Sequence, residues 1–259
     1  SKMKFFDTHA HIGLITEDPI EQLIISQEAK QANVAHIVSI CNSLKDFALV
    51  YENLQTATHV YHSIGVSPSE VANPGKDWQL TIEEGVKKDR IVAIGEIGLD
   101  YFRKFGNKDS QVELFIRQLE MAERLDLPVI IHNRDAGKDI YDILRDKIPS
   151  KGAILHCYSE NWEYGKKALD LNIYISLAGN VTYRNARNHH ETAKNMPLDR
   201  ILIESESPFM VPSDYRGKRN KPSYIHATAQ FIAELRDEPD DEVYEALYRN
   251  ALTFFGLSE

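Results

Sequence analysis

The sequence predicts an α/β protein with the fold of a (β/α)8 TIM barrel. Eight short apolar runs recur along the chain, and an amphipathic or polar segment follows each of them. The runs are nearly continuous in apolar residues, which is typical of parallel strands covered by helices. Eight such units in 259 residues fit a closed barrel best, and an open doubly wound sheet is the structural alternative.

The predicted strands are rich in Ile, Val, Leu and Ala, and polar or turn-forming residues separate them. They cover residues 3–6, 36–40, 60–66, 91–97, 129–132, 153–157, 173–177 and 201–203. The first helix is expected near Asp18, because Pro19 then occupies the first helical position, where no N–H is needed. Further helices are expected at 44–54, 78–86, 112–125, 140–144, 162–169, 186–194, 226–235 and 242–255, with a loop at 212–222.

Composition and charge narrow the classes of function. The net charge of -9 argues against a protein that grips long polyanions over a broad surface, so any contact with nucleic acid must be local. Cys41 and Cys157 are the only cysteines, which favours a reducing compartment. Because the sequence also shows no secretion signal, we expect a cytoplasmic protein. No apolar run approaches a membrane span, and no obligate protein partner is evident. We expect one domain over 1–259, with Ser1 and Lys2 as a possible cloning remnant before Met3.

The chemistry is expected where the strands end, because TIM barrels build their active sites at the carboxyl ends of the strands. Five of the eight predicted strands end in histidine or carboxylate side chains. Taken singly, each of these side chains is explained equally well as a hydrogen-bonded core histidine or as part of a structural ion pair. A metal centre explains all of them with one cause. The candidate ligands at these strand ends are His9, His11, Glu96, His132, His156 and Glu206.

The eighth strand ends in ILIESESPF, which carries two carboxylates two residues apart. Residues i and i+2 of a strand share a face, so Glu204 and Glu206 would repel each other unless a cation lies near them. We expect Glu206, nearer the mouth, to be a ligand and the general base, and Glu204 and Asp7 to orient the ligands. Six ligand groups exceed the need of one zinc ion and suit two cations about 3.5–4 Å apart. A strand cap on the solvated surface is the alternative.

The loop YRGKRNKP, at residues 215–222, is basic in an otherwise acidic chain. TIM barrels often bind phosphate after their seventh and eighth strands, so Arg216 and Arg219 are candidate phosphate contacts. Arg134 and Arg184, near the ends of strands five and seven, could join them. A solvated basic loop is the equally ordinary alternative.

Taken in order, the motifs DTHAH, GEIGLDY, IHNRDA, LHCYS, ESESP and RGKRNKP resemble those of the TatD family of metal-dependent hydrolases, also called TatD-like deoxyribonucleases. The resemblance spans residues 6–257 and places the chain in the amidohydrolase-like superfamily. It implies a divalent-metal-dependent phosphodiesterase that acts on DNA with a preference for ends. It also implies that His9 and His11 hold one metal, that His132 and His156 hold the other, and that Glu96 bridges both.

Three motifs depart from the family pattern. The last ligand is usually an aspartate in ETDxP, and Glu206 stands there, longer by one methylene. Two serines, Ser67 and Ser69, replace the histidines of GxHPH; Ser67 still offers a hydroxyl to phosphate but cannot carry a proton near neutral pH. Glu160 stands where LHCFSG has glycine and would hinder the binding of a polyanion.

Three functions remain open at this point. The first is a two-metal phosphodiester hydrolase acting on DNA or a small phosphodiester. The second is a metal-dependent amidohydrolase or an esterase for a small or aminoacyl substrate, and the third is a metal-binding barrel without turnover. Imidazole ligands allow Zn, Fe or Ni, and the carboxylates allow Mg or Mn, so the residues do not select one ion.

Overall fold

Eight parallel strands form one sheet in the computed structural model of the chain, which describes residues 3–259. Each strand pairs with the next along the chain, which is the order of a TIM barrel and rules out the doubly wound alternative. The expectation for Ser1 and Lys2 lies outside the described residues. The strands are β1 (Phe5–Ala10), β2 (Val34–Ser39), β3 (Val60–Ile64), β4 (Ile91–Asp100), β5 (Val129–Arg134), β6 (Ala153–Leu155), β7 (Ile173–Leu177) and β8 (Ile201–Ile203).

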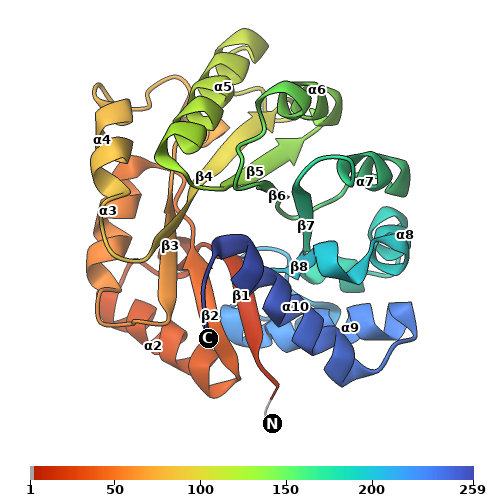
Figure 1. Cartoon of the computed structure of the whole chain (residues 1–259). Helices are drawn as coiled ribbons and strands as arrows, with labels where there is room; N and C mark the ends of the chain where they lie inside the picture. Colours follow the sequence, from red (N-terminus) through yellow and green to blue (C-terminus); the bar gives the residue numbers. More distant parts are fainter. Residues whose placement is uncertain (1–2) are drawn as a thin grey trace.

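Helices surround the strands, as the ring of coiled ribbons in Figure 1 shows. Within residues 3–259, none of them is long and apolar enough to cross a bilayer. The α-helices are α1 (Ile12–Ile15), α2 (Pro19–Gln31), α3 (Leu44–Asn53), α4 (Trp78–Gly85), α5 (Lys108–Leu125), α6 (Gly137–Lys147), α7 (Trp162–Ala168), α8 (Arg187–Asn195), α9 (Ile225–Arg236) and α10 (Asp240–Phe255). Short 3-10 turns are η1 (Pro68–Glu70), η2 (Gly179–Thr182), η3 (Leu198–Arg200), η4 (Ser213–Tyr215) and η5 (Pro222–Tyr224).

Backbone hydrogen bonds join β1 to the segment that follows β8. His11 N donates to Ser207 O, and Glu206 N donates to His9 O, each at 2.9 Å. Both bonds lie at the carboxyl ends of the strands. The first and last strand ends therefore meet through residues that carry candidate ligands.

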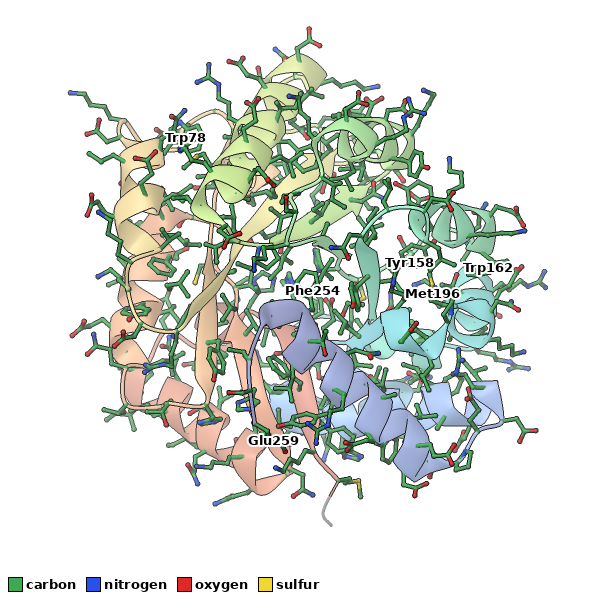
Figure 2. The ribbon with its side chains drawn as sticks, viewed as in Figure 1. Trp78, Tyr158, Trp162, Met196, Phe254 and Glu259 are labelled. Atoms are coloured by element: carbon green, nitrogen blue, oxygen red, sulfur yellow. The ribbon has the colours of Figure 1, made fainter. Side chains whose placement is uncertain are left out.

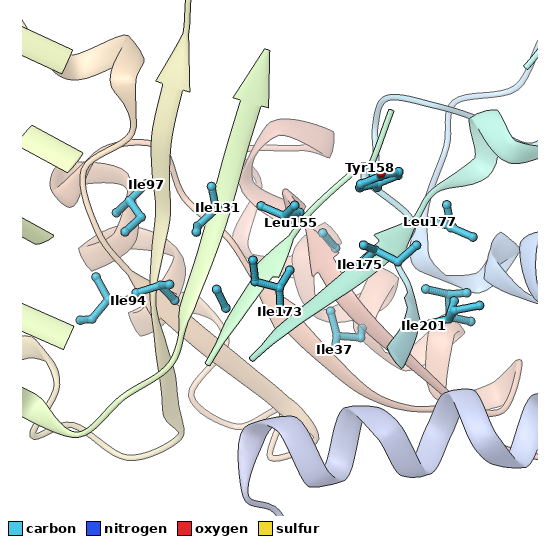
Figure 3. Packing of buried hydrophobic residues seen from close by; sticks show 14 of the residues in the cluster. Ile37, Ile94, Ile97, Ile131, Leu155, Tyr158, Ile173, Ile175, Leu177 and Ile201 are labelled. Carbon is cyan, nitrogen blue, oxygen red and sulfur yellow. The ribbon is translucent and has the colours of Figure 1, made fainter. Parts of the chain in front are cut away.

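The core has two layers of apolar side chains. Outward-facing residues of neighbouring strands, such as Ile131, Leu155 and Ile175, pack between the strands and the helices (Figure 3). A second cluster holds inward-facing strand residues together with the end of α10, where Phe6 stacks on Phe255 at 5.6 Å between ring centroids. Phe254 and Glu259 in Figure 2 mark this end of the chain, which closes the base of the barrel. Burying one such side chain contributes about 1.5–3 kcal/mol.

The observed element boundaries differ from the predicted ones where polar residues continue a strand. β1 runs to Ala10 instead of ending at residue 6, and β4 runs to Asp100 instead of 97, because the backbone pairing with the next strand continues. β6 is shorter than predicted and ends at Leu155. The short helix α1 and the 3-10 turns were not predicted, since such short elements lack a hydrophobic period. The helix start predicted near Asp18 is confirmed as the start of α2, where the Asp18 side chain accepts a hydrogen bond from Ile20 N at 2.9 Å.

A buried histidine on β3 is expected to make the fold sensitive to acid. His62 is 1% exposed and lies beside the ring of Tyr51, and burial lowers its pKa to about 3. Between pH 6.5 and 3 the unfolded chain binds a proton here that the folded chain does not, so stability falls as the pH falls. We expect the free energy of unfolding of the parent to drop by about 2 kcal/mol relative to His62→Phe between pH 7 and 5. Urea unfolding of both proteins at each pH measures this, and identical pH profiles would refute it.

Candidate metal centre

Seven of the predicted residues form one cluster at the carboxyl ends of the strands. They come from four separate regions: β1 and its end, β4, the neighbouring ends of β5 and β6, and the end of β8. They fall into three overlapping groups. Within each group, every residue offers one nitrogen or oxygen atom that lies within 4.8 Å of the atoms offered by the others. The members are His9, His11, Glu96, His132, His156, Glu204 and Glu206.

The alternation of strand side chains explains why this polar cluster lies directly above an apolar base. Ile154 and Leu202 belong to the inner apolar cluster, and His156 and Glu204 follow two residues later on the same face. The inner apolar residues fill the barrel, so the next inward-facing positions reach its mouth. All four of these residues are buried.

One side of the cluster pairs the two histidines of DTHAH with two glutamates. His9 Nε2 lies 3.2 Å from His11 Nε2 and 3.0 Å from Glu96 Oε1. His11 Nε2 lies 3.1 Å from Glu206 Oε1. Two imidazole nitrogens and two carboxylate oxygens, all from buried residues, therefore face one another.

The other side of the cluster shares Glu96. His132 Nδ1 lies 3.4 Å from Glu96 Oε2, and His156 Nε2 lies 3.6 Å from Glu96 Oε1. His9 and His156 also stack with ring centroids 3.9 Å apart. Glu96 is thus the carboxylate that both histidine pairs face.

Two further carboxylates hold the histidines of the second pair. Glu204 Oε2 lies 3.1 Å from His156 Nδ1, and its other oxygen accepts a hydrogen bond from Cys157 N at 3.0 Å. Asp100 Oδ2 lies 2.9 Å from His132 Nε2. No role was predicted for Asp100, although the LDY of GEIGLDY carries a signal: an acidic residue on the strand next to that of His132.

Asp7 lies on β1, and its side chain holds the backbone of the site in place. Its Oδ1 accepts hydrogen bonds from His9 N at 3.1 Å and from Ser205 N at 2.8 Å. Its side chain is fully buried, and this burial raises the pKa of Asp7 to about 7. Asp7 therefore ties the end of β1 to the segment after β8.

The buried carboxylates create a strong demand for positive charge. Burial alone would raise the pKa of Glu96, but His156, His9 and His132 hold it well below its usual value. Burial likewise opposes ionisation of Glu206, yet the same histidine cluster lowers its pKa to about 2. Against the effect of burial, Glu96, Glu204 and Glu206 raise the pKa of His156 to about 10. The His156 imidazole and these carboxylates therefore stabilise each other's charged forms.

The same residues fit divalent metal ions. Glu96 Oε1 and Glu206 Oε1 are buried and have no hydrogen-bond partner within residues 3–259. Both atoms face imidazole nitrogens at 3.0–3.7 Å. Imidazole and carboxylate together suit Zn, Fe, Ni or Mn, and a bound cation would compete with protons for the imidazole nitrogens.

Two non-glycine residues at the site adopt left-handed backbone conformations. Glu206 has φ 53° and Cys157 has φ 45°. Such conformations cost about 1–3 kcal/mol each and gather at functional sites. At Glu206 the turn directs the backbone N–H toward His9 O, which places its carboxylate beside the histidines.

The predicted phosphate contacts lie outside the cluster. Arg134, Arg184, Arg216 and Arg219 are all exposed. Arg134 lies over the ring of Phe102, 4.3 Å from its centroid. Arg219 Nη2 donates to Leu14 O at 3.1 Å, which ties the basic loop to α1.

The two departures from the family pattern that concern substrate have defined positions. Ser67 is only 2% exposed, and its hydroxyl lies 2.5 Å from that of Ser69. Glu160 Oε2 accepts a hydrogen bond from Asn133 Nδ2 at 2.8 Å. It also packs against Gly137, at the first turn of α6. A carboxylate therefore already occupies the positive end of that helix.

This protein is a TIM barrel with a buried cluster of histidines and carboxylates at its mouth, which is the architecture of metal-dependent hydrolases. The family model described as TatD-related DNase matches residues 6–256, and the chain belongs to this family.

Individual relatives cover almost the whole chain. YabD of Bacillus subtilis (strain 168), a metal-dependent hydrolase by name, is 35% identical over 98% of this chain and 99% of its own length. YcfH of Escherichia coli (strain K12), named in the same way, is 34% identical over 98% and 97%. The crystal structure of YjjV, a TatD homologue from E. coli K12, superposes with a TM-score of 0.89 at 27% identity and covers 98% of each chain.

Proposed function

We propose that this metal-dependent hydrolase cleaves phosphodiester bonds of DNA from strand ends, with two divalent cations in the cluster. The observation that carries the proposal is the position of Glu96 between the two histidine pairs. Its Oε1 faces His9, His11 and His156, and its Oε2 faces His132. His9 and His11 would hold one cation and His132 and His156 the other, with Glu96 between them and Glu206 as the last ligand. Bound there, the cations would polarise the phosphoryl group and acidify the attacking water.

The chain's own residues position the reactants and move the proton. Glu206 Oε1, which lacks a hydrogen-bond partner among the described residues, would accept the proton of the attacking water. Glu204 and Asp100 keep the imidazoles of His156 and His132 in fixed orientations. The exposed Arg216 and Arg219 of the basic loop would hold the phosphates next to the scissile bond.

An end-directed mode agrees with the charge of the molecule. The net charge is -9, and four basic residues gather in the one loop at 215–222. A long duplex laid across the surface would meet repulsion beyond that loop. A single strand end or a small phosphodiester needs only the local contact.

The experiment is a nuclease assay on the protein stripped of metal and then supplied with Mg, Mn, Zn, Co, Fe or Ni. We expect release of nucleotides from labelled linear single-stranded DNA and none from closed circular single strands. Glu206→Asp keeps the charge and both oxygens and should retain activity to within about tenfold, while Glu206→Gln should lose about 100-fold or more.

Each alternative predicts a different result in this assay. Equal cleavage of circular and linear DNA would remove the end-directed mode. Bound metal without DNA cleavage, but with hydrolysis of aminoacyl esters or N-acyl amino acids, would move the reaction to a carbonyl. Activity in Glu206→Asp alone would mean that the glutamate has disabled this copy.

A further inference from the structure

A cavity opens beside the metal cluster, between α1, the end of β2 and the helices α2 and α3. Its volume is about 390 Å³, which is in the range of small-molecule sites. His11 forms part of its wall, while His11 Nε2 faces Glu206 Oε1 at 3.1 Å. One imidazole therefore separates the cavity from the centre of the cluster.

The walls of this cavity carry large apolar side chains that remain open to solvent. Leu14 of α1 is 46% exposed and Leu49 of α3 is 57% exposed, and both line the cavity with Ile40 and Val50. Adjacent exposed apolar side chains beside a polar site are typical of a ligand surface. They would cover the faces of a flat apolar group.

Three polar residues of the cavity wall present hydrogen-bond acceptors. Asn42 Oδ1 is buried and has no hydrogen-bond partner within residues 3–259. Glu17 and Asp46 also line the cavity, and no lysine or arginine does so among the described residues. An anionic group would meet two carboxylates here, so the phosphate of a substrate belongs elsewhere.

The surroundings of the cavity suggest where that phosphate would lie. Two residues of its wall connect it to the sites proposed for phosphate: His11 belongs to the cluster, and the carbonyl of Leu14 accepts a hydrogen bond from Arg219 of the basic loop. A substrate held through phosphate at the cluster and the loop would have its next group at the mouth of the cavity. That group must be flat, largely apolar and rich in donors along its edge.

We propose that this cavity binds the base of the nucleotide whose phosphodiester lies at the cluster, and that it prefers bases with an exocyclic amino group. This inference rests on the proposed function. Adenine and cytosine present an amino donor that Asn42 Oδ1 can accept, whereas thymine presents a carbonyl oxygen there. The apolar faces of any base would contact Leu14 and Leu49.

Calorimetric titration tests the proposal without relying on turnover. The probes are dAMP, dCMP, dTMP and deoxyribose 5-phosphate, each added to the purified protein. We expect dAMP and dCMP to bind at least tenfold tighter than deoxyribose 5-phosphate and severalfold tighter than dTMP. Leu49→Trp, which fills the cavity, should reduce dAMP to the affinity of the sugar phosphate. Asn42→Leu should remove the difference between dCMP and dTMP.

The control variant is Leu80→Trp, an equally exposed leucine (56%) on α4, outside the cavity. It should bind all four probes as the parent does. Equal affinities for the nucleotides and the sugar phosphate in the parent, or unchanged dAMP binding in Leu49→Trp, would overturn the proposal.

The nuclease assay separates this failure from that of the proposed function. If DNA ending in an abasic residue is cleaved as fast as DNA ending in deoxyadenosine, the proposed base site is refuted and the proposed phosphodiesterase activity is retained. If dAMP binds as expected and no DNA is cleaved, the proposed activity is refuted and the base site is retained.

Discussion

Replacement of Glu96 by glutamine is expected to abolish hydrolysis and to lower the amount of bound metal. Glutamine keeps the size of the side chain, but it removes the charge and one acceptor oxygen between the two histidine pairs. We expect kcat to fall by about 1,000-fold or more, which corresponds to about 4 kcal/mol of lost transition-state stabilisation. Metal content should fall from the two ions per chain that we propose for the parent to one or fewer. Mass spectrometry of the metals and single-turnover kinetics measure both effects.

The matched control is Glu113→Gln on α5. Glu113 is exposed and pairs with Arg117 one helical turn away at 2.9 Å, a contact worth a fraction of a kcal/mol. It should leave activity and metal content unchanged. A Glu96→Gln protein that still binds two ions and cleaves DNA at the parent rate would show that this carboxylate does not bridge the pairs.

Much of the fold could be predicted because the apolar runs are short, regular and separated by turn signals. The run Ile201 to Ile203 illustrates this, since it forms β8 as predicted. The clustering of the residues that end such runs could also be predicted, because parallel strands bring their carboxyl ends to one rim of the barrel. His132 and His156 are 24 positions apart, yet their nitrogens lie 3.4 Å from each other.

The parts that sequence reasoning missed depend on side-chain direction and loop paths. Asp100 contacts His132 because β4 continues three residues past the predicted end, and no apolar pattern marks that extension. The cavity beside His11 depends on α1, a four-residue helix too short to leave a periodic signal.

Gly98→Ala is the second substitution for which we expect a large effect. Gly98 lies on β4 opposite His132, with φ 146°, a conformation that residues with a side chain rarely adopt. A Cβ atom here would come within 1.9 Å of His132 O, which is backbone and cannot rotate away. We expect the variant to lose about 4 kcal/mol of stability, from the strained conformation and the clash together. Chemical unfolding measures this loss.

A control at Gly75 separates the two costs. Gly75 has φ 105°, but a Cβ atom there would meet nothing within 4 Å, so Gly75→Ala should cost only about 1–2 kcal/mol. The excess at Gly98 would then come from the clash with the strand that carries His132. If Gly98→Ala folds, the displaced β5 should also weaken metal binding, because His132 faces Glu96 and Asp100 only when β4 and β5 approach closely. Equal losses in the two variants would mean that β5 yields easily, and the close approach of the strands would then not be what positions His132.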